Sequence, residues 1–345
     1  MKVQYASDLH LEFYDNSVFI ARQPFKVTGD VLVLAGDTLP LAEFDAYKRH
    51  RFFDWCSENY RETFLVPGNH EYYRDTIDAY PDSWEKPLRE NVRMCENRVI
   101  RVDDVDFILS TLWSHIPGKD WLKIKNGMSD FTLIRDGKYP FTANTYNELH
   151  ERDLAFIKDA VSSSDAAHKV VVTHHVPSRL LVAPEFKGSS LENGFTVDLT
   201  KYIESSSIDL WVYGHSHRSI SRRIGGTLVV SNQIGYVVYG EYKTHFSGDR
   251  VADLDALENS LPEEKPETIS LSNRHNGGVF LEQTALGSPW YKLTGNIRYM
   301  RIIGDNPIEA FDPDGGPFVS VGSRIGKRLV MEIRREDENL LVKLK

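Results

Sequence analysis

Residues 64–71 read Phe-Leu-Val-Pro-Gly-Asn-His-Glu, and this stretch decides the fold class. Its apolar start predicts a short buried strand, and Gly68 indicates a tight turn directly after it. Asn69 and His70 then stand where the strand ends, and both side chains are suited to binding a metal ion or a substrate. Because ligands of open α/β sheets gather at the carboxyl ends of strands, the stretch predicts an α/β protein with its site at that edge.

The same pattern recurs through the first 220 residues. Further apolar runs, rich in β-branched and aromatic residues, predict buried strands at residues 3–6, 31–35, 107–111, 170–173 and 210–213. Amphipathic stretches at residues 43–59 and 144–163 predict helices between the strands. Regular alternation of strands and helices favours an α/β sandwich.

The remainder of the chain has a different character. Residues 222–230 predict a β-hairpin that turns at Gly225 and Gly226. An acidic, polar stretch over residues 249–268 predicts a linker or loop, and short β-like runs predict a small β-rich C-terminal region at residues 269–345. We therefore predict a main domain of residues 1–248 followed by these two parts, which a chain of 345 residues can accommodate.

Composition and charge exclude several classes of protein. The net charge is −9 and no basic stripe is visible, which disfavours a nucleic-acid partner without excluding one, because bound metal ions add local positive charge. No apolar run approaches the roughly 18 residues that a membrane span needs, and the N-terminus lacks a signal peptide, so we expect a cytoplasmic protein. Cys56 and Cys95 are too few and too far apart for a disulfide framework or a thiolate zinc site.

The residues that carry chemistry follow the predicted strands in order. Each strand end supplies at least one potential metal ligand or acid–base group: Asp8, His10, Asp37, Asn69, His70, His174, His215 and His217. In extended backbone, residues two apart point the same way, so Asp8 with His10, and His215 with His217, would each face one cavity. Any one of these histidines alone would more often be structural, but an ordered series that closes successive strands predicts a shared site.

The ligand chemistry combines imidazole nitrogen and oxygen atoms without thiolate. Such a donor set suits manganese, iron, zinc or nickel better than calcium or magnesium. The set exceeds what one four-coordinate zinc requires, and two ions that share a carboxylate explain the excess. Pairs of metal ions about 3.5–4 Å apart recur in enzymes that hydrolyse phosphoesters. The sequence therefore predicts two divalent metal ions, with manganese as the leading candidate.

The motifs Asp-x-His, Gly-Asp, Gly-Asn-His-Glu, a His after an apolar strand, and Gly-His-x-His together resemble the calcineurin-like metallophosphoesterase superfamily. The resemblance covers roughly residues 1–240 and implies a four-layer α-β-β-α sandwich. It implies ligands for two ions: Asp8, His10 and His217 for the first, Asn69, His174 and His215 for the second, and Asp37 as the bridge. His70 resembles the histidine that contacts substrate and protonates the leaving oxygen. His175 is expected to contact the ligands and not the metal ions. The alternative, in which His175 is the ligand and His174 is not, stays open.

One departure concerns His70. Related protein phosphatases carry an Asp three residues after the bridging one and then an Arg, whereas this chain has Pro40 and Leu41 there. A Ser/Thr protein phosphatase is therefore disfavoured, and the group that orients His70 is not evident. Residues 111–113 and 127–131 resemble a bacterial subgroup of small cytoplasmic metallophosphoesterases, which sharpens the expected fold more than the substrate.

The resulting hypothesis is dimetal-dependent hydrolysis of a nucleotide or other small phosphoester, by a phosphodiesterase or phosphatase. A nuclease with a C-terminal cap, a lipid-precursor pyrophosphohydrolase and a non-catalytic scaffold stay open as alternatives, and the sequence does not give the oligomeric state. Weaker site candidates, each with a packing role as the alternative, are His115, His150, Tyr72, Tyr73, Arg74, Asn232 and Tyr236.

Overall fold

The computed structural model describes residues 1–259, 268–270, 279–284, 288–295, 299–303, 306–311, 317–325, 328–336 and 339–345. The chain forms two compact units. The first consists of Met1–Val237 and Glu241–Leu261, and the second of Val238–Gly240 and Pro262–Lys345. The division at residues 248 and 269 stays a prediction.

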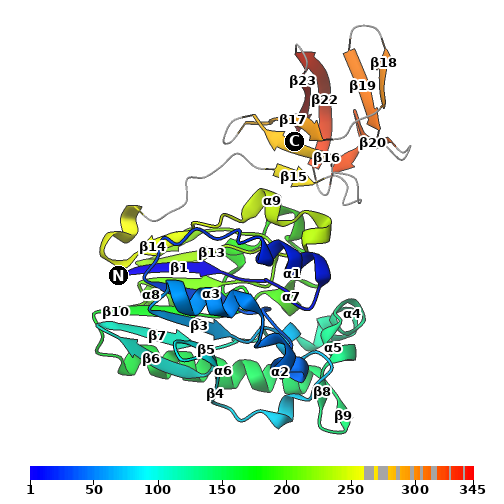
Figure 1. Ribbon diagram of the computed structural model, residues 1–345. Helices are drawn as coiled ribbons and strands as arrows, with labels where there is room; N and C mark the ends of the chain where they lie inside the picture. The colour runs from blue at the N-terminus through cyan, green and yellow to red at the C-terminus, as the bar shows by residue number, and fades with distance from the viewer. Residues whose placement is uncertain are drawn as a thin grey trace. The chain divides into compact units, whose positions relative to one another are not determined.

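The first unit contains two six-stranded sheets (Figure 1). The first sheet has, in spatial order, β14 (Val251–Asp253), β1 (Lys2–Ala6), β2 (Val31–Ala35), β3 (Glu62–Val66), β5 (Val92–Glu96) and β4 (Trp84–Arg89). Its four inner strands are parallel, and the two edge strands run antiparallel to them. The inner strands therefore end at one edge of the sheet.

The second sheet repeats this plan. Its strands are, in spatial order, β12 (Arg222–Ile224), β13 (Thr227–Ser231), β11 (Leu210–Tyr213), β10 (His168–Val172), β7 (Val105–Leu109) and β6 (Arg98–Val102). The four inner strands are again parallel with antiparallel edges. The hairpin predicted at residues 222–230 is confirmed as β12 and β13.

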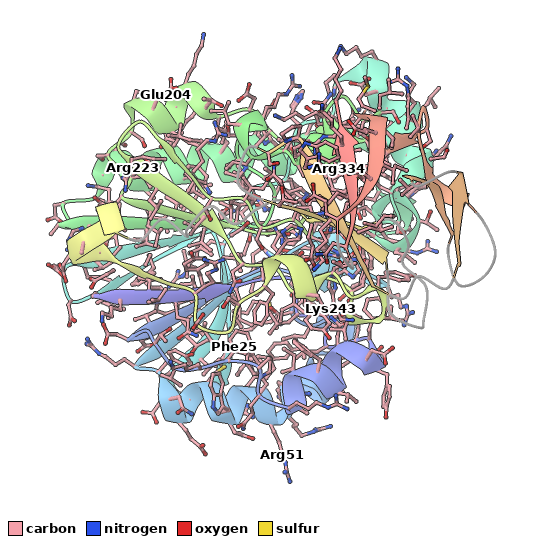
Figure 2. All side chains as sticks on the ribbon, turned by 90° about the horizontal axis from the view of Figure 1, so that it is seen from above. Phe25, Arg51, Glu204, Arg223, Lys243 and Arg334 are labelled. Atoms are coloured by element: carbon pink, nitrogen blue, oxygen red, sulfur yellow. The ribbon has the colours of Figure 1, made fainter. Side chains whose placement is uncertain are left out.

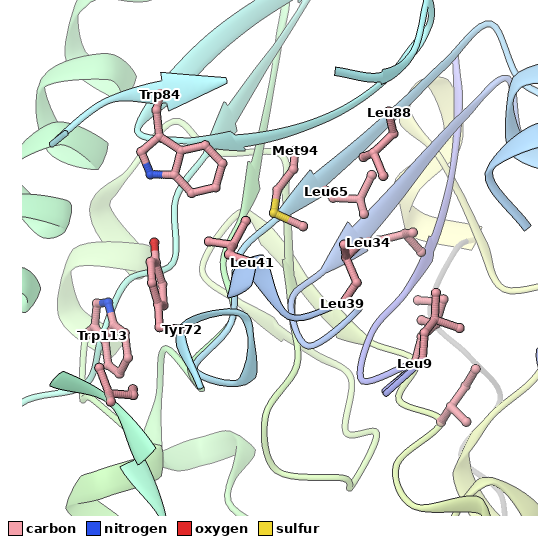
Figure 3. Packing of buried hydrophobic residues seen from close by; sticks show 14 of the residues in the cluster. Leu9, Leu34, Leu39, Leu41, Leu65, Tyr72, Trp84, Leu88, Met94 and Trp113 are labelled. Atoms are coloured by element: carbon pink, nitrogen blue, oxygen red, sulfur yellow. The ribbon is translucent and has the colours of Figure 1, made fainter. Parts of the chain in front are cut away.

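Alternation along the strands divides the core into layers. In β2, Val31, Val33 and Ala35 pack between the two sheets, whereas Leu32 and Leu34 face the helices outside the first sheet. Figure 3 shows Leu34 and Leu65 in this outer layer among other buried side chains. Each fully buried Val or Leu stabilises the fold by roughly 1.5–3 kcal/mol, which explains why strands buried on both faces read as continuous apolar runs.

Helices cover the outer face of each sheet. α1 (Tyr14–Ala21) and α3 (Arg51–Asn59) pack against the first sheet, and α6 (Ala143–Ser163) and α8 (Thr200–Ser205) against the second. Figure 2 shows Arg51 and Glu204 on the two opposite outer layers. The predicted four-layer α-β-β-α sandwich is confirmed. Shorter elements complete the unit: α2 (Phe44–Tyr47), α4 (Trp121–Gly127), α5 (Asp130–Leu133), β8 (Arg135–Asp136), β9 (Tyr139–Pro140), α7 (Glu192–Phe195) and α9 (Tyr242–His245).

One helix prediction was wrong. The single helix expected over residues 43–59 is two helices, α2 and α3, that are separated at His50. His50 has extended backbone, and its Nδ1 accepts a hydrogen bond from the N–H of Phe52 at 3.2 Å. Such a cap satisfies a free N–H at a helix start, so His50 begins a new helix instead of continuing the old one.

Part of the stretch predicted as an acidic linker belongs to the first sheet. Within residues 249–268, β14 pairs with β1, and buried Ala252 lies opposite Val3. The short alternation around Ala252 is a weak strand signal among acidic residues, and backbone pairing with β1 decides the structure. Residues 260–267 of the stretch lie outside the described residues.

The second unit confirms the predicted β-rich C-terminal region. Its larger sheet has the order β15 (Thr268–Ser270), β16 (Val279–Gln283), β17 (Trp290–Gly295), β23 (Asn339–Leu344), β22 (Arg328–Glu336) and β21 (Arg324–Ile325). A smaller sheet has β18 (Tyr299–Ile303), β19 (Asn306–Phe311) and β20 (Pro317–Ser320). Leu281, Tyr291 and Val342 are buried in a core of its own. Across the described ranges of both units, none of the helices has the length and apolar character that a bilayer span requires.

Candidate metal centre

The predicted ligands lie in the loops that follow β1, β2, β3, β10 and β11, at the carboxyl ends of both sheets. Hydrogen bonds join the two sheets there. The backbone N–H of His215 donates to Asp8 Oδ1 at 3.0 Å, and His174 Nδ1 donates to the carbonyl oxygen of Ala35 at 2.9 Å. The expectation that separate strands deliver their polar residues to one place is thus met by the geometry.

Three groups of side chains lie close enough to hold a metal ion. Each group brings its ligand atoms within 4.8 Å of one another: Asp8, His10 and His217; His10, Asp37 and His70; Asp37, His174 and His215. His10 and Asp37 each belong to two groups, so the three groups form one continuous cluster. Asp37 belongs to the second and third groups, so it lies towards the middle of the cluster, where a bridging carboxylate is expected.

In the first group, two imidazoles present the same atom to each other. Nε2 of His10 and Nε2 of His217 are 3.1 Å apart, and Asp8 Oδ1 is 3.4 Å from His217 Nε2. The Nδ1 atoms face carboxylates, Glu12 Oε1 at 3.1 Å from His10 and Glu241 Oε2 at 2.7 Å from His217. When both rings are neutral, a proton on each Nδ1 directs the two Nε2 lone pairs at each other, so a proton or a cation is needed between them. A cation between them removes this conflict.

The third group, which contains Asp37, His174 and His215, presents a nitrogen atom without a partner. Within the described residues, buried His215 Nε2 has no hydrogen-bond partner. His174 Nε2 lies 3.3 Å from Asp37 Oδ1 and 3.1 Å from Asn69 Oδ1. Because the amide nitrogen of Asn69 donates to Asp130 Oδ1 at 2.9 Å, its oxygen is directed towards His174. A buried unpaired nitrogen is costly, and a bound ion would satisfy it.

Electrostatics also fit a cation. Burial raises the pKa of Asp37, but the neighbouring His174 and His70 outweigh burial and hold it well below its usual range. Burial lowers the pKa of His174, but Asp37 outweighs this and raises it to about 9. Burial, with the charge of His174, holds the pKa of His215 well below its ordinary value, so His215 is a neutral imidazole. Asp37 and His215 therefore have the deprotonated state that a metal ligand needs, and a cation would replace the proton on His174.

The backbone at the site is strained. Positive φ angles of 57°, 49°, 53°, 74° and 50° occur at Asp8, His10, Asp37, His215 and His217. Each such conformation costs on the order of 1–3 kcal/mol for a residue with a side chain and is typical of functional sites. The pairs two residues apart therefore converge through left-handed backbone, and the extended backbone expected from the sequence was wrong.

Glu12 answers the open question of what orients His70. Its Oε1 atom accepts a hydrogen bond from His70 Nδ1 at 2.8 Å and also contacts His10 Nδ1 at 3.1 Å. Burial raises the pKa of Glu12, but His10 and His70 outweigh it and bring it down to about 2. Glu12 therefore takes the place of the Asp whose position is occupied by Pro40. Sequence reasoning missed it, although its spacing two residues after His10 was a usable signal.

Glu71 is a second missed residue with a clear structural role. Its buried carboxylate accepts hydrogen bonds from the backbone N–H groups of Asp37, Thr38, Leu39 and Gly68 at 2.6–3.0 Å. Burial and the charge of Asp37 raise its pKa to about 7. The carboxylate joins the loops after β2 and β3, so it fixes Asp37 relative to Asn69.

The weaker candidates divide into two sets. His175 lies behind His215, with ring centroids 4.2 Å apart, and its Nε2 lies 3.1 Å from the Tyr146 hydroxyl. Tyr73 stacks on His70 at 4.1 Å, and the Tyr236 hydroxyl lies 3.5 Å from His70 Nε2, so both border the cluster. Among the described residues, His115 and His150 belong to none of the three groups of potential ligands. Tyr72 packs in the core, and the Asn232 amide donates to the carbonyl oxygens of Tyr5 and Ser247. Arg74 has no contact that places it at the cluster in the described residues.

The comparisons with known proteins agree with this geometry. A family model described as calcineurin-like phosphoesterase matches residues 1–219. The chain belongs to this family. The family typically binds divalent metal ions and hydrolyses phosphoesters. The chain's membership of this family confirms the resemblance that the motifs indicated.

Two relatives extend the comparison. An uncharacterised protein, L509 of Acanthamoeba polyphaga mimivirus, is 28% identical over 280 residues, which cover 74% of this chain and 97% of that protein. The crystal structure of the phosphopantetheinyl hydrolase of Mycobacterium tuberculosis has a TM-score of 0.50 at 18% identity and covers 70% of this chain and 91% of that one. At 18% identity, this similarity shows that the two proteins share a fold and nothing more.

Proposed function

We propose that this phosphoesterase hydrolyses a small-molecule phosphoester, such as a nucleotide, with two divalent cations. Asp8, His10 and His217 would hold the first cation, and Asn69, His174 and His215 the second, with Asp37 between them. The observation that carries the proposal is the convergence of His10 Nε2 and His217 Nε2 at 3.1 Å, with both Nδ1 atoms directed at carboxylates. Nitrogen and oxygen donors without thiolate favour manganese, with iron, zinc or nickel as alternatives.

Paired divalent ions lower the pKa of water and neutralise phosphoryl charge when they are bound. The protein groups behind the ligands fix the geometry. Glu12 and Glu241 hold the imidazoles of His10 and His217, and Ala35 holds that of His174 through its carbonyl oxygen. Such outer partners set ring orientation and tautomer, and their loss typically costs 10–100-fold in metal affinity or activity.

His70 would supply the proton to the leaving oxygen. Its Nδ1 donates to Glu12, which leaves Nε2 directed into the cluster, 4.0 Å from Asp37 Oδ2. Burial lowers the pKa of His70, but Asp37 and Glu12 outweigh burial and raise it, which favours the protonated ring. Proton delivery by a positioned acid is worth about 10²–10⁴-fold in rate.

The choice of a small substrate rests on charge and on the complete ligand set. The chain carries a net charge of −9, which disfavours a polyanion such as a nucleic acid. All predicted ligands are present, which disfavours a non-catalytic scaffold.

Hydrolysis of bis-p-nitrophenyl phosphate and p-nitrophenyl phosphate, measured with added manganese, tests this proposal. We expect wild-type protein to cleave at least one ester, and His70→Ala to keep its metal while losing about 10²–10⁴-fold in turnover. His115→Ala, which changes an exposed histidine outside the three groups, is the matched control and should retain activity. Normal turnover of His70→Ala would remove His70 from the mechanism, and full metal occupancy of Asp37→Ala would remove the bridge.

A further inference from the structure

An apolar cavity of ≈ 220 Å³ lies beside the candidate metal centre, in the first unit. The segment between β10 and α8 supplies most of its wall, through Val176, Val182, Ala183, Leu191 and Phe195. An apolar cavity of about 150 Å³ is large enough to bind benzene, so this one has room for a substituted ring or a short alkyl chain.

Phe195 connects the cavity to the proposed ligands. Its ring stacks on the imidazole of His215, with centroids 4.5 Å apart and planes 26° apart, and it also lines the cavity. Ser216, which lies between His215 and His217 in sequence, is part of the same wall. Phe195 and Ser216 therefore place the cavity next to His215, a proposed ligand of the second metal ion.

Arg218 contacts both a residue of the cavity wall and the backbone of a proposed ligand. Its guanidinium lies 5.5 Å from the ring centroid of Phe186, which lines the cavity, and donates to the carbonyl oxygen of His217 at 2.9 Å. The guanidinium adds positive charge near the proposed ligands, which favours an anionic phosphoryl group there.

Glu192 and Ser189, two polar residues of the wall, already make contacts within the protein. Glu192 Oε2 accepts from the N–H of Gly188 at 2.6 Å, and Oε1 lies 3.6 Å from Arg179 Nε. Ser189 Oγ accepts from the N–H of Leu191 at 3.2 Å. A sugar or a nucleobase buried here would lose hydrogen bonds to water with little compensation, whereas an apolar group would not.

From these contacts we propose that the cavity binds an apolar alkyl or aryl group of the phosphoester, and so sets the substrate class. The inference rests on the proposed function, because the phosphoryl group must be held at the metal cluster. The substrate is then an ester with an anionic phosphoryl end and an apolar end. Burial of the apolar end would by itself favour binding. Each methylene group removed from water should increase the affinity about fourfold.

Calorimetric titration of manganese-loaded protein with alkylphosphonates tests this, since these probes bind without being hydrolysed. We expect affinity to rise from methylphosphonate to hexylphosphonate by at least about tenfold, because three buried methylenes would give about 60-fold. The analogue 3-hydroxypropylphosphonate, which matches butylphosphonate in length, should bind more weakly than butylphosphonate because its hydroxyl would be buried unpaired.

Two variants locate the effect. Ala183→Phe fills the cavity and should reduce the hexyl-to-methyl affinity ratio to below about threefold, and Val182→Thr should reduce it partly by adding a hydroxyl of similar volume. Leu180→Phe places the same aromatic ring at an exposed position of the same segment and should keep the wild-type ratio.

Equal affinities for methyl- and hexylphosphonate, or an unchanged ratio in both Ala183→Phe and Val182→Thr, would overturn the cavity assignment and leave the proposed hydrolysis intact. Absence of binding by every phosphonate, together with absence of hydrolysis of both nitrophenyl esters, would overturn the proposed function and the cavity assignment together.

Discussion

Glu12 Oε1 accepts a hydrogen bond from His70 Nδ1 at 2.8 Å, and this contact fixes the imidazole that we assign as the proton donor. Glu12→Gln keeps the size of the side chain but removes its charge. We expect turnover to fall about 10–100-fold while most of the bound metal is retained. Activity assays combined with metal analysis check this, and Glu204→Gln, on the exposed face of α8, is the matched control.

The same variant should change the pH profile. Glu12 raises the pKa of His70, and an acid catalyst is active only while it is protonated. Without the charge of Glu12 the pKa of His70 falls, so the alkaline decline of turnover should move to lower pH. A profile that keeps its alkaline limb in Glu12→Gln would contradict the role of this contact.

Gly36 tests how closely the backbone approaches a proposed ligand. It has a φ of 88°, and a Cβ atom there would lie 2.2 Å from His174 Nδ1. Gly36→Ala should therefore displace His174 and lower occupancy of the second metal position by at least about tenfold. Gly226→Ala is the control, because its Cβ would meet nothing within 4 Å. Equal metal content in the two variants would argue against His174 as a ligand.

Glu71 should matter for stability more than any exposed acid. Glu71→Ala leaves four buried backbone N–H groups without their acceptor, and each loss costs about 1–3 kcal/mol before relaxation. We expect the free energy of unfolding to fall by roughly 3–5 kcal/mol in urea denaturation. Glu204→Ala should change it by less than about 0.5 kcal/mol. A loss below about 1 kcal/mol for Glu71→Ala would show that water replaces the carboxylate.

Metal-free protein should lose stability as the pH rises from about 7 to 10. Asp37 raises the pKa of His174 to about 9, and Asp8 with Glu241 raises that of His217 to about 10, in both cases against burial. A raised pKa stabilises the fold fully below the unfolded value near 6.5, and this stabilisation disappears as pH passes the folded value. Thermal denaturation across this range should show the decline without metal and little decline with manganese. Identical profiles would indicate that no cation replaces these protons.

The clustering of the proposed ligands was predictable because their signals are local. Each follows a short apolar strand, and parallel strands carry their carboxyl ends to one edge, so order along the chain translated into proximity. His174 and Asp37 illustrate this, since their contact at 3.3 Å joins loops 137 residues apart that both follow central strands. The left-handed backbone at Asp37 was not readable, because it results from hydrogen bonds that only the folded loops provide.

Features that depend on the path of a loop were not predictable. Glu241 contacts His217 only because the chain returns to the site after β13, and Glu71 acts through backbone groups of two other loops. The break at His50 arises from a side-chain cap that competes with a helical pattern continuing through it. The apolar cavity is walled mostly by a segment that contains only short helical elements such as α7, so its sequence has no periodic pattern that marks a cavity.

The most direct test of the central claim is anomalous diffraction from crystals grown with manganese. The proposed centre predicts two peaks about 3.5–4 Å apart. One should lie among Asp8, His10 and His217, the other among Asn69, His174 and His215, with Asp37 between them. Two results would contradict the two-metal centre on which the proposed hydrolysis rests. One is the absence of any peak in the cluster, and the other is a single ion that does not bind His215 Nε2.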